Sequence, residues 1–235
     1  MSSSFRFTHA ITRSPGESIA SGLRAEDTGN PNPEQFSLQH RAYIRALEEA
    51  GVIVEVLPEL EEFPDSVFIE DSSLCLSKGA VLMRPGAPTR TGESAVMADI
   101  FNKYYDDVRS IGEAGFIEGG DILVTDREII VGPSDRTDRA GARNLQDLVA
   151  DWGYKVRILQ TPPDVLHFKT ACGLIDSETI LMTKQMAGLG FFDDYENLII
   201  PEGEEPAANA IRVNDHVFVS SGFPKTADML TDAGY

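Results

Sequence analysis

The sequence has few of the features that mark secreted or membrane-inserted proteins. It contains two cysteines among 235 residues, Cys75 and Cys172, so no disulfide framework is expected. No apolar run approaches the roughly 20 residues that a membrane-spanning helix requires. The first residues, Met1 to His9, lack the apolar core of a signal peptide. These absences predict a cytoplasmic protein without a membrane partner.

Positive charge is also scarce. The chain has 20 Lys and Arg against 38 Asp and Glu, which gives a formal net charge of −18. Such a surface repels polyanions, so nucleic acid is not an expected partner. The charge does not exclude a small cation as ligand, and it fits either a saline host or ordinary solubility. With 42% hydrophobic residues over 235 positions, the chain can form one large domain or two small ones.

One order of elements recurs along the chain: a helix ends in glycine, a strand follows, then a loop with acids or histidine, then a hairpin. Helical spacing of apolar residues predicts helices over 33–50, 91–105, 138–152 and 225–232. Strands are predicted over 52–58, 73–77, 80–83, 108–111, 121–125, 128–131, 154–159, 171–175, 178–183, 198–201, 209–213 and 216–219. A repeat of roughly 40–50 residues is typical of closed arrays. A ring of strand–strand–helix–strand units is therefore expected, with an ordinary open α/β sheet as the alternative.

Side chains of opposite charge occupy equivalent loops of these units. Asp65 and Asp71 lie in one loop, Glu118 flanks a glycine pair in the next, and two arginines, Arg90 and Arg136, follow hairpins. Arginine binds a carboxylate through two parallel hydrogen bonds, and paired acids bind a guanidinium or ammonium group. Together these groups would suit a zwitterionic amino acid with a cationic side chain. Each also has a structural alternative: a solvated turn for the acids, and a surface ion pair for each arginine.

His167 is a further candidate, although a histidine between Leu166 and Phe168 can equally be a core residue. Several segments together resemble one known family. They are 63–71 (FPDSVFIED), Arg84-Pro85-Gly86 with Arg90, 118–121 (EGGD), Arg136-Thr137, 166–170 (LHFKT) and 207–209 (AAN). They look like dimethylarginine dimethylaminohydrolase, a guanidine-modifying pentein family related to arginine deiminase. The resemblance runs from about Phe7 to Tyr235 and implies one α/β domain, 1–235, folded as a propeller of five ββαβ units.

The resemblance implies a role for each matching residue and no metal or organic cofactor. Glu118 and His167 match the catalytic Glu and His of the family. The residues that match its substrate-binding positions are Asp71 at the guanidinium, Asp65 and the Leu23 backbone at the α-amino group, Arg90 and Arg136 at the carboxylate, and Glu70 as a second acid near the site.

The family also requires a cysteine thiolate that attacks the guanidinium carbon and forms a thiouronium-like intermediate. Cys172 follows His167 by five residues, which on a regular strand places the two side chains on opposite faces and about 16 Å apart. Cys75, between Leu74 and Leu76, is predicted to be a small core residue. We therefore expect the nucleophile, and the last strand of the fifth unit, beyond residue 235, and the 235-residue chain to be inactive.

The sequence thus predicts a hydrolase that converts Nω-methylated arginine to citrulline and a methylamine. Three alternatives remain: an arginine deiminase-like or other guanidine hydrolase, a non-catalytic pentein that binds a guanidino ligand or a protein partner, and an acidic α/β protein without a site. The partner is a small-molecule substrate, methylated arginine or arginine. The oligomeric state stays open, with a homodimer as one option.

Overall fold

The structure is a computed structural model that describes residues 4–24 and 29–235. Its strands are β1 (His9–Arg13), β2 (Ile53–Leu57), β3 (Ser73–Leu76), β4 (Gly79–Leu82), β5 (Val108–Ser110), β6 (Ile122–Val124), β7 (Ile129–Val131), β8 (Val156–Ile158), β9 (Cys172–Leu174), β10 (Thr179–Met182), β11 (Glu196–Ile199), β12 (Ile211–Val213) and β13 (His216–Phe218). The α-helices are α1 (Pro33–Glu49), α2 (Ile69–Ser72), α3 (Ala98–Phe101), α4 (Arg139–Val149), α5 (Lys184–Ala187) and α6 (Pro224–Asp232). Short 3₁₀ turns are η1 (Glu17–Ser21), η2 (Pro88–Arg90), η3 (Glu93–Met97), η4 (Gly119–Asp121), η5 (Phe168–Thr170) and η6 (Glu205–Ala208).

The strands of the described residues form five separate small sheets. Three sheets share one pattern: an antiparallel hairpin, then a helical segment, then a strand parallel to the second hairpin strand. These are β3–β4–β5, β6–β7–β8 and β9–β10–β11. The other two sheets have two strands each, the parallel pair β1–β2 and the hairpin β12–β13. The α/β class and the repeated unit are confirmed, and the alternative of one open sheet is wrong.

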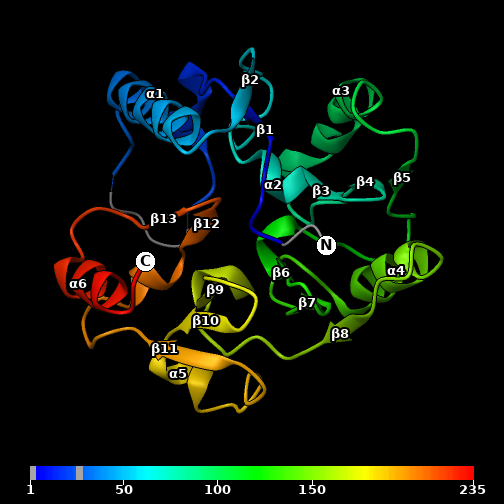
Figure 1. Cartoon of the computed structure of the whole chain (residues 1–235). Coiled ribbons are helices and arrows are strands. Elements are labelled where there is room, and N and C mark those ends of the chain that lie inside the picture. Colours follow the sequence, from blue (N-terminus) through cyan, green and yellow to red (C-terminus); the bar gives the residue numbers. More distant parts are fainter. Residues whose placement is uncertain (1–3, 25–28) are drawn as a thin grey trace.

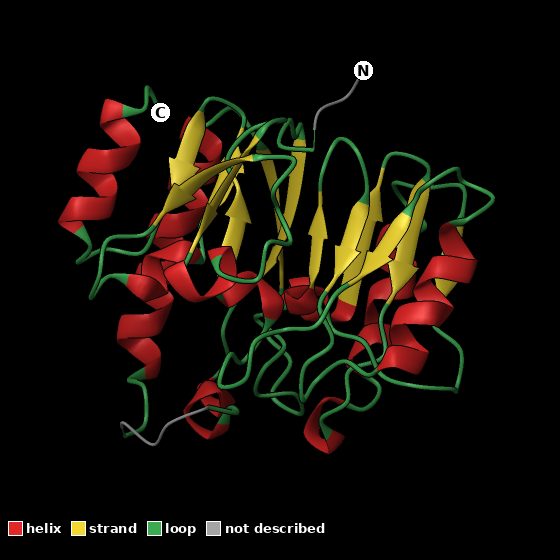
Figure 2. Ribbon diagram, turned by 90° about the horizontal axis from the view of Figure 1, so that it is seen from below, coloured by secondary structure: helices red, strands yellow, loops and turns green. Residues whose placement is uncertain are grey.

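The sheets are grouped around a common centre. Figure 1 shows α1, α3, α4, α5 and α6 toward the outside and α2 nearer the middle. Seen from below in Figure 2, the strands run side by side, and many loops and short helical turns gather at one end of them. No helix in the described part of the chain combines the length and the apolar character needed to cross a bilayer.

Glycine ends three helices in the same way. Gly51, Gly153 and Gly234 have φ values of 85°, 87° and 93°, which place them in the left-handed region after α1, α4 and α6. The next residue then turns its N–H back to a helix carbonyl, as Val52 does to Leu47 and Tyr235 to Leu230. Glycine adopts this conformation without a steric penalty from Cβ, so the helix ends predicted from these glycines are confirmed.

Two local predictions need correction. The region 91–105 is not one α-helix: the 3₁₀ turn η3 leads directly into the short α3. Strand β1, which pairs in register with β2 from His9 opposite Ile53 to Arg13 opposite Leu57, was not predicted. The strand was missed because polar residues, Thr12 and Arg13, occupy its buried end and interrupt the apolar alternation that marks a strand. The buried guanidinium of Arg13 donates a hydrogen bond to the carbonyl of Pro58.

Apolar side chains fill the space between each sheet and its helix. In the largest cluster, Leu145 and Val149 of α4 pack on Val81, Ile129 and Val131 from two neighbouring sheets, and all five are fully buried. Several carboxylates are buried as well, among them Asp65, Asp71, Glu118 and Asp121. Because a buried charge is costly without partners, these acids identify the part of the fold where a polar site is built.

Candidate active site

Three short helical turns bring the predicted residues together. Each of α2, η4 and η5 directly precedes the first strand of a hairpin, and they carry or flank Asp71, Glu118 and His167. The glycine pair of η4 allows these turns to approach closely. A Cβ atom at Gly119 would lie 1.9 Å from the carbonyl oxygen of Glu70, and one at Gly120 would lie 2.8 Å from Cγ of His167. The two glycines are therefore required by packing, not only by a turn.

Glu118 is a fully buried acid of this group. Its side chain is 0% exposed, and Oε2 lies 3.5 Å from Nε2 of His167. Its nearest cations are Arg90, with Nη1 3.9 Å from Oε2, and Arg136, with Nη1 3.8 Å from Oε1. Among the described residues, neither carboxylate oxygen accepts a hydrogen bond. Burial, followed by the charge of Asp71, raises the pKa of Glu118 above its usual range, against the opposing effect of these cations.

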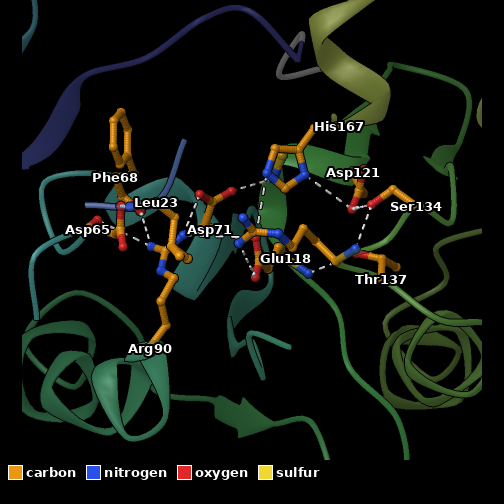
Figure 3. A network of polar contacts seen from close by, with 12 residues as sticks. Leu23, Asp65, Phe68, Asp71, Arg90, Glu118, Asp121, Ser134, Thr137 and His167 are labelled. Atoms are coloured by element: carbon orange, nitrogen blue, oxygen red, sulfur yellow. Dashed lines mark hydrogen bonds and ion pairs between the residues drawn. The ribbon is translucent and has the colours of Figure 1, made fainter. Parts of the chain in front are cut away.

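His167 lies between two acids, as Figure 3 shows. Nε2 faces Glu118, while Nδ1 lies 3.3 Å from Oδ2 of Asp121. Burial lowers the pKa of His167, but contact with Asp121 and the charges of Asp121, Asp71 and Glu118 outweigh burial, so the pKa is raised above its ordinary value. A raised pKa means that the imidazole holds a proton more readily than a free histidine does, which suits transfer of that proton to a leaving group.

Arg90 is buried within the protein. Nε and Nη2 donate to the two carboxylate oxygens of Glu93 at 2.8 and 2.7 Å, and Nη1 donates to Oδ2 of Asp71 at 2.7 Å. Nη2 also donates to the carbonyls of Asp65 and Phe68 at 3.3 and 3.2 Å. The predicted contact of Arg90 with a substrate carboxylate stays a prediction.

Arg136 is placed differently. Its side chain is 21% exposed, and its guanidinium makes no hydrogen bond within the residues that the structure describes. Its backbone N–H donates to Oγ of Ser134, and the neighbouring Thr137 accepts from the backbone N–H of Glu118. The guanidinium of Arg136 is thus held near Glu118 by its loop while its donors remain available to a ligand.

Asp65 and the backbone of Leu23, which are predicted to bind the α-amino group of a substrate, are in contact with each other. The backbone N–H of Leu23 donates to Oδ1 of Asp65 at 2.9 Å, and Asp65 is buried. The side chain of Leu23 is exposed beside it. Glu70, by contrast, points to the surface and forms an ion pair with Lys169. It lies at the edge of the site, next to Asp71 in the chain.

Neither cysteine reaches this group. Cys172 is fully buried, its Sγ lies 3.5 Å from the carbonyl of Phe168, and burial raises the pKa of its thiol. The regular strand assumed between His167 and Cys172 was wrong, because η5 intervenes, but Cys172 still points into the core. Cys75 is exposed on β3, so the predicted core position is also wrong.

One ligand atom each of Asp71, Glu118 and His167 lies within 4.8 Å of the others, which is a geometry that can hold a metal ion. Arg90 and Arg136 already bring positive charge to the same two carboxylates. A planar organic cation can share this space with the arginines through directed hydrogen bonds, whereas a divalent ion would lie close to the guanidinium of Arg90. The donor set therefore suits a guanidinium better than a metal.

Known proteins match this chain over nearly its full length. The family model "Arginine deiminase" matches residues 53–196. A dimethylarginine dimethylaminohydrolase from Pseudomonas aeruginosa is 35% identical over 230 residues, which is 97% of this chain and 90% of that protein. The chain belongs to the dimethylarginine dimethylaminohydrolase family. The family that the segments of the sequence resemble is thereby confirmed.

Solved structures agree with this assignment to the family. A cysteine-to-serine variant of the P. aeruginosa enzyme, complexed with citrulline, superposes with a TM-score of 0.95 and covers 98% of this chain and 91% of that one. The N-terminal domain of ArgZ, a cyanobacterial arginine dihydrolase, has a TM-score of 0.81 at 20% identity, covers 96% of this chain and 87% of its own, and shares the fold.

Three residues that support the site were not predicted from the sequence to do so. They are Glu93, which pairs with Arg90, Ser134, which donates to Asp121, and Thr137, which holds the backbone of Glu118. Glu93 could have been noticed, since it follows Arg90 by three residues, the spacing of neighbours on a helical turn. The other two act through contacts that no local pattern reveals.

Proposed function

We propose that this chain builds the binding and proton-transfer site of a hydrolase that converts Nω-methylated arginine to citrulline and a methylamine. The observation that carries the proposal is the carboxylate of Glu118, which is 0% exposed and accepts no hydrogen bond from the described residues. Burying such a group without donors costs free energy. A substrate guanidinium supplies the missing N–H donors and adds positive charge to that of Arg90 and Arg136.

The remaining groups orient such a substrate. Asp71, beside Glu118, would accept further guanidinium N–H bonds, as the family resemblance implies. Arg136, with its available guanidinium, would bind the substrate carboxylate, and Arg90 is proposed to assist it. Asp65 and the Leu23 backbone would bind the α-amino group. Opposite charges at the two ends of the site would then select a zwitterionic amino acid with a cationic side chain.

The proposed reaction follows from His167. A cysteine thiolate adds to the guanidinium carbon, and the C–N bond to the methylated nitrogen breaks as His167 gives its proton to the departing amine. Neutral His167 then takes a proton from water, and the water oxygen adds to the same carbon. As the C–S bond breaks, the remaining hydroxyl proton passes to solvent, which releases neutral citrulline and the thiolate. Neither Cys75 nor Cys172 can be this nucleophile, so we propose that the thiolate comes from outside these 235 residues.

We further propose that residues 1–235 act as one catalytic domain with the five sheets as the blades of a pentein propeller. What supports this is that the site draws on segments from Leu23 to His167, which belong to several sheets. A cytoplasmic location, a homodimer and the lack of a cofactor stay predictions.

The competing substrate is unmethylated arginine. The family model that matches residues 53–196 is named for arginine deiminase, which favours this second candidate specifically. A methyl group alters binding by only about 1–3 kcal/mol, so a modest change in the pocket would separate the two substrates. Turnover of both substrates, measured side by side, decides between them.

The test has a binding arm and a turnover arm. Calorimetric titration of the 235-residue chain with Nω,Nω-dimethylarginine should detect binding, and ornithine, which lacks the guanidinium, should bind at least tenfold more weakly. The Glu118→Gln variant should lose this preference. The 235-residue chain itself should release no citrulline, whereas the protein with its cysteine nucleophile should release citrulline and dimethylamine in equal amounts. Equal binding of dimethylarginine and ornithine would contradict the proposal.

A further inference from the structure

Asp121 is the one acid of the Glu118–Asp121 segment to which the proposed reaction assigns no role. It ends η4, just before β6, and its side chain is 0% exposed. Its backbone is fixed at both ends, since its N–H donates to the carbonyl of Glu118 and its own carbonyl accepts from the N–H of Gly132. A buried carboxylate on so rigid a backbone presents its two oxygens in fixed directions.

Those directions converge on His167. Oδ1 of Asp121 accepts the backbone N–H of Phe168, the next residue after His167, at 2.8 Å. Oδ2 accepts the hydroxyl of Ser134 at 2.7 Å and lies 3.3 Å from Nδ1 of His167. One carboxylate therefore binds the backbone next to the histidine and faces Nδ1 at the far edge of its ring, as Figure 3 shows for the ring.

We propose that Asp121 is a positioning residue that keeps the Nδ1 proton on neutral His167 and directs Nε2 toward Glu118 and the reacting carbon. The catalytic role given to Nε2 rests on the proposed function, but the distances between Asp121 and His167 do not depend on that function. A carboxylate accepts and cannot donate, so each acid favours hydrogen on the nitrogen that faces it, and Asp121 lies nearer to the ring, at 3.3 Å against 3.5 Å for Glu118. Burial also favours the protonated form of Glu118, and a protonated carboxyl can donate to Nε2. Nε2, 3.5 Å from Oε2 of Glu118, is then the nitrogen that gains and loses the catalytic proton.

Ser134 extends this arrangement to the substrate-binding loop. Its hydroxyl donates to Asp121 and accepts the backbone N–H of Arg136 at 3.0 Å. The orientation of His167 and the position of the Arg136 loop are thereby tied to one carboxylate. Charged residues on the elements around His167 include Glu70, Asp71, Arg90, Glu118, Asp121, Arg136, Lys169 and Glu205. Of these, Asp121 makes the closest approach to Nδ1.

The decisive measurement is NMR of the His167 ring nitrogens in the ligand-free chain. In the wild type above its titration midpoint, the ring should carry hydrogen on Nδ1. In Asp121→Asn, the amide oxygen can still accept from Phe168, while the amide nitrogen replaces Oδ2. The proton should therefore move to Nε2 and the midpoint should shift to lower pH, because a stabilising negative charge is lost.

Two matched variants separate positioning from general damage. Ser134→Ala keeps the carboxylate and should retain the wild-type tautomer. Asp126→Asn removes a charge from the exposed turn of the same hairpin and should leave the His167 titration unchanged. In the protein with its nucleophile, Asp121→Asn should lower kcat by about 10²–10⁴-fold with KM changed only a few-fold.

The outcomes are distinguishable. Hydrogen on Nε2 in the wild type would overturn the proposal without any variant, so a failure of Asp121→Asn to fold does not protect it. An unchanged tautomer and midpoint in folded Asp121→Asn would also overturn it and leave Asp121 a purely structural residue. A tautomer change in a protein that never releases citrulline would support the positioning role while the proposed substrate fails.

Discussion

Nη1 of Arg90 lies 2.7 Å from Oδ2 of Asp71, and the two side chains are only 4% and 13% exposed. The other edge of the same guanidinium is bound by Glu93, which is 3% exposed. A buried guanidinium with two carboxylates holds those acids in place, and its removal would leave both charges unpaired. Arg90 is thus part of the scaffold of the site whether or not it also contacts substrate.

Replacing Arg90 tests this role. Arg90→Met should lower the free energy of unfolding by about 3–5 kcal/mol, because a buried pair that loses one partner leaves uncompensated charge. The control is Arg6→Met, which removes the exposed ion pair with Asp215 and should cost about 0–1 kcal/mol. Urea denaturation measures both. A cost for Arg90→Met as small as that of the control would mean that the pair does not stabilise the fold.

Arg136 should behave in the opposite way. Arg136→Ala should leave the melting temperature nearly unchanged, since its guanidinium makes no hydrogen bond within the described residues, but should weaken binding of dimethylarginine by about 10–100-fold. The decarboxylated analogue of the ligand offers a matched control, because it lacks the carboxylate that Arg136 is proposed to bind. Calorimetry should show its affinity reduced much less. An equal loss for both ligands would assign Arg136 to another part of the site.

Glu118→Gln should make the protein more stable and less able to bind. Its folded-state pKa is raised above the ordinary 4.5 by burial and by Asp71. The protonated form is therefore favoured by folding, and this contribution to stability is lost as the pH rises through the folded pKa. The variant should match the wild type at pH 4 and exceed it by about 0.5–2 kcal/mol at pH 7. Denaturation at the two pH values measures this, and a gap that shrinks with pH would contradict it.

Gly120→Ala should disturb the ring of His167 directly. The added Cβ would lie 2.8 Å from Cγ of His167 and 2.9 Å from Oδ1 of Asp71, so the ring must move. In the protein with its cysteine nucleophile, a displacement of this size should lower kcat for citrulline release by about 10²-fold. Gly188→Ala is the control, because its Cβ would meet only ordinary contacts of 3.5 and 3.6 Å after α5. Full activity in Gly120→Ala would show that the ring position is not critical.

The sequence by itself determined most of the helices and strands of this protein and the family to which it belongs. Helices α1, α4 and α6, their glycine ends and the hairpins follow from apolar periodicity and from left-handed glycines, which are properties of a few neighbouring residues. The segments 63–71 and 166–170 are specific enough to indicate the family because both the residue types and their spacing match.

Only the tertiary structure decided which charges meet. Phe168 and Asp121 are 47 residues apart in the chain, and Lys169 and Glu70 are 99 apart, yet each pair is in contact. The exposure of Cys75, the burial of Arg90 against Glu93 and the pairing of β1 with β2 depend likewise on how the sheets pack. Periodicity is a local property, whereas a buried charge acquires its partner from whichever segment the fold places beside it.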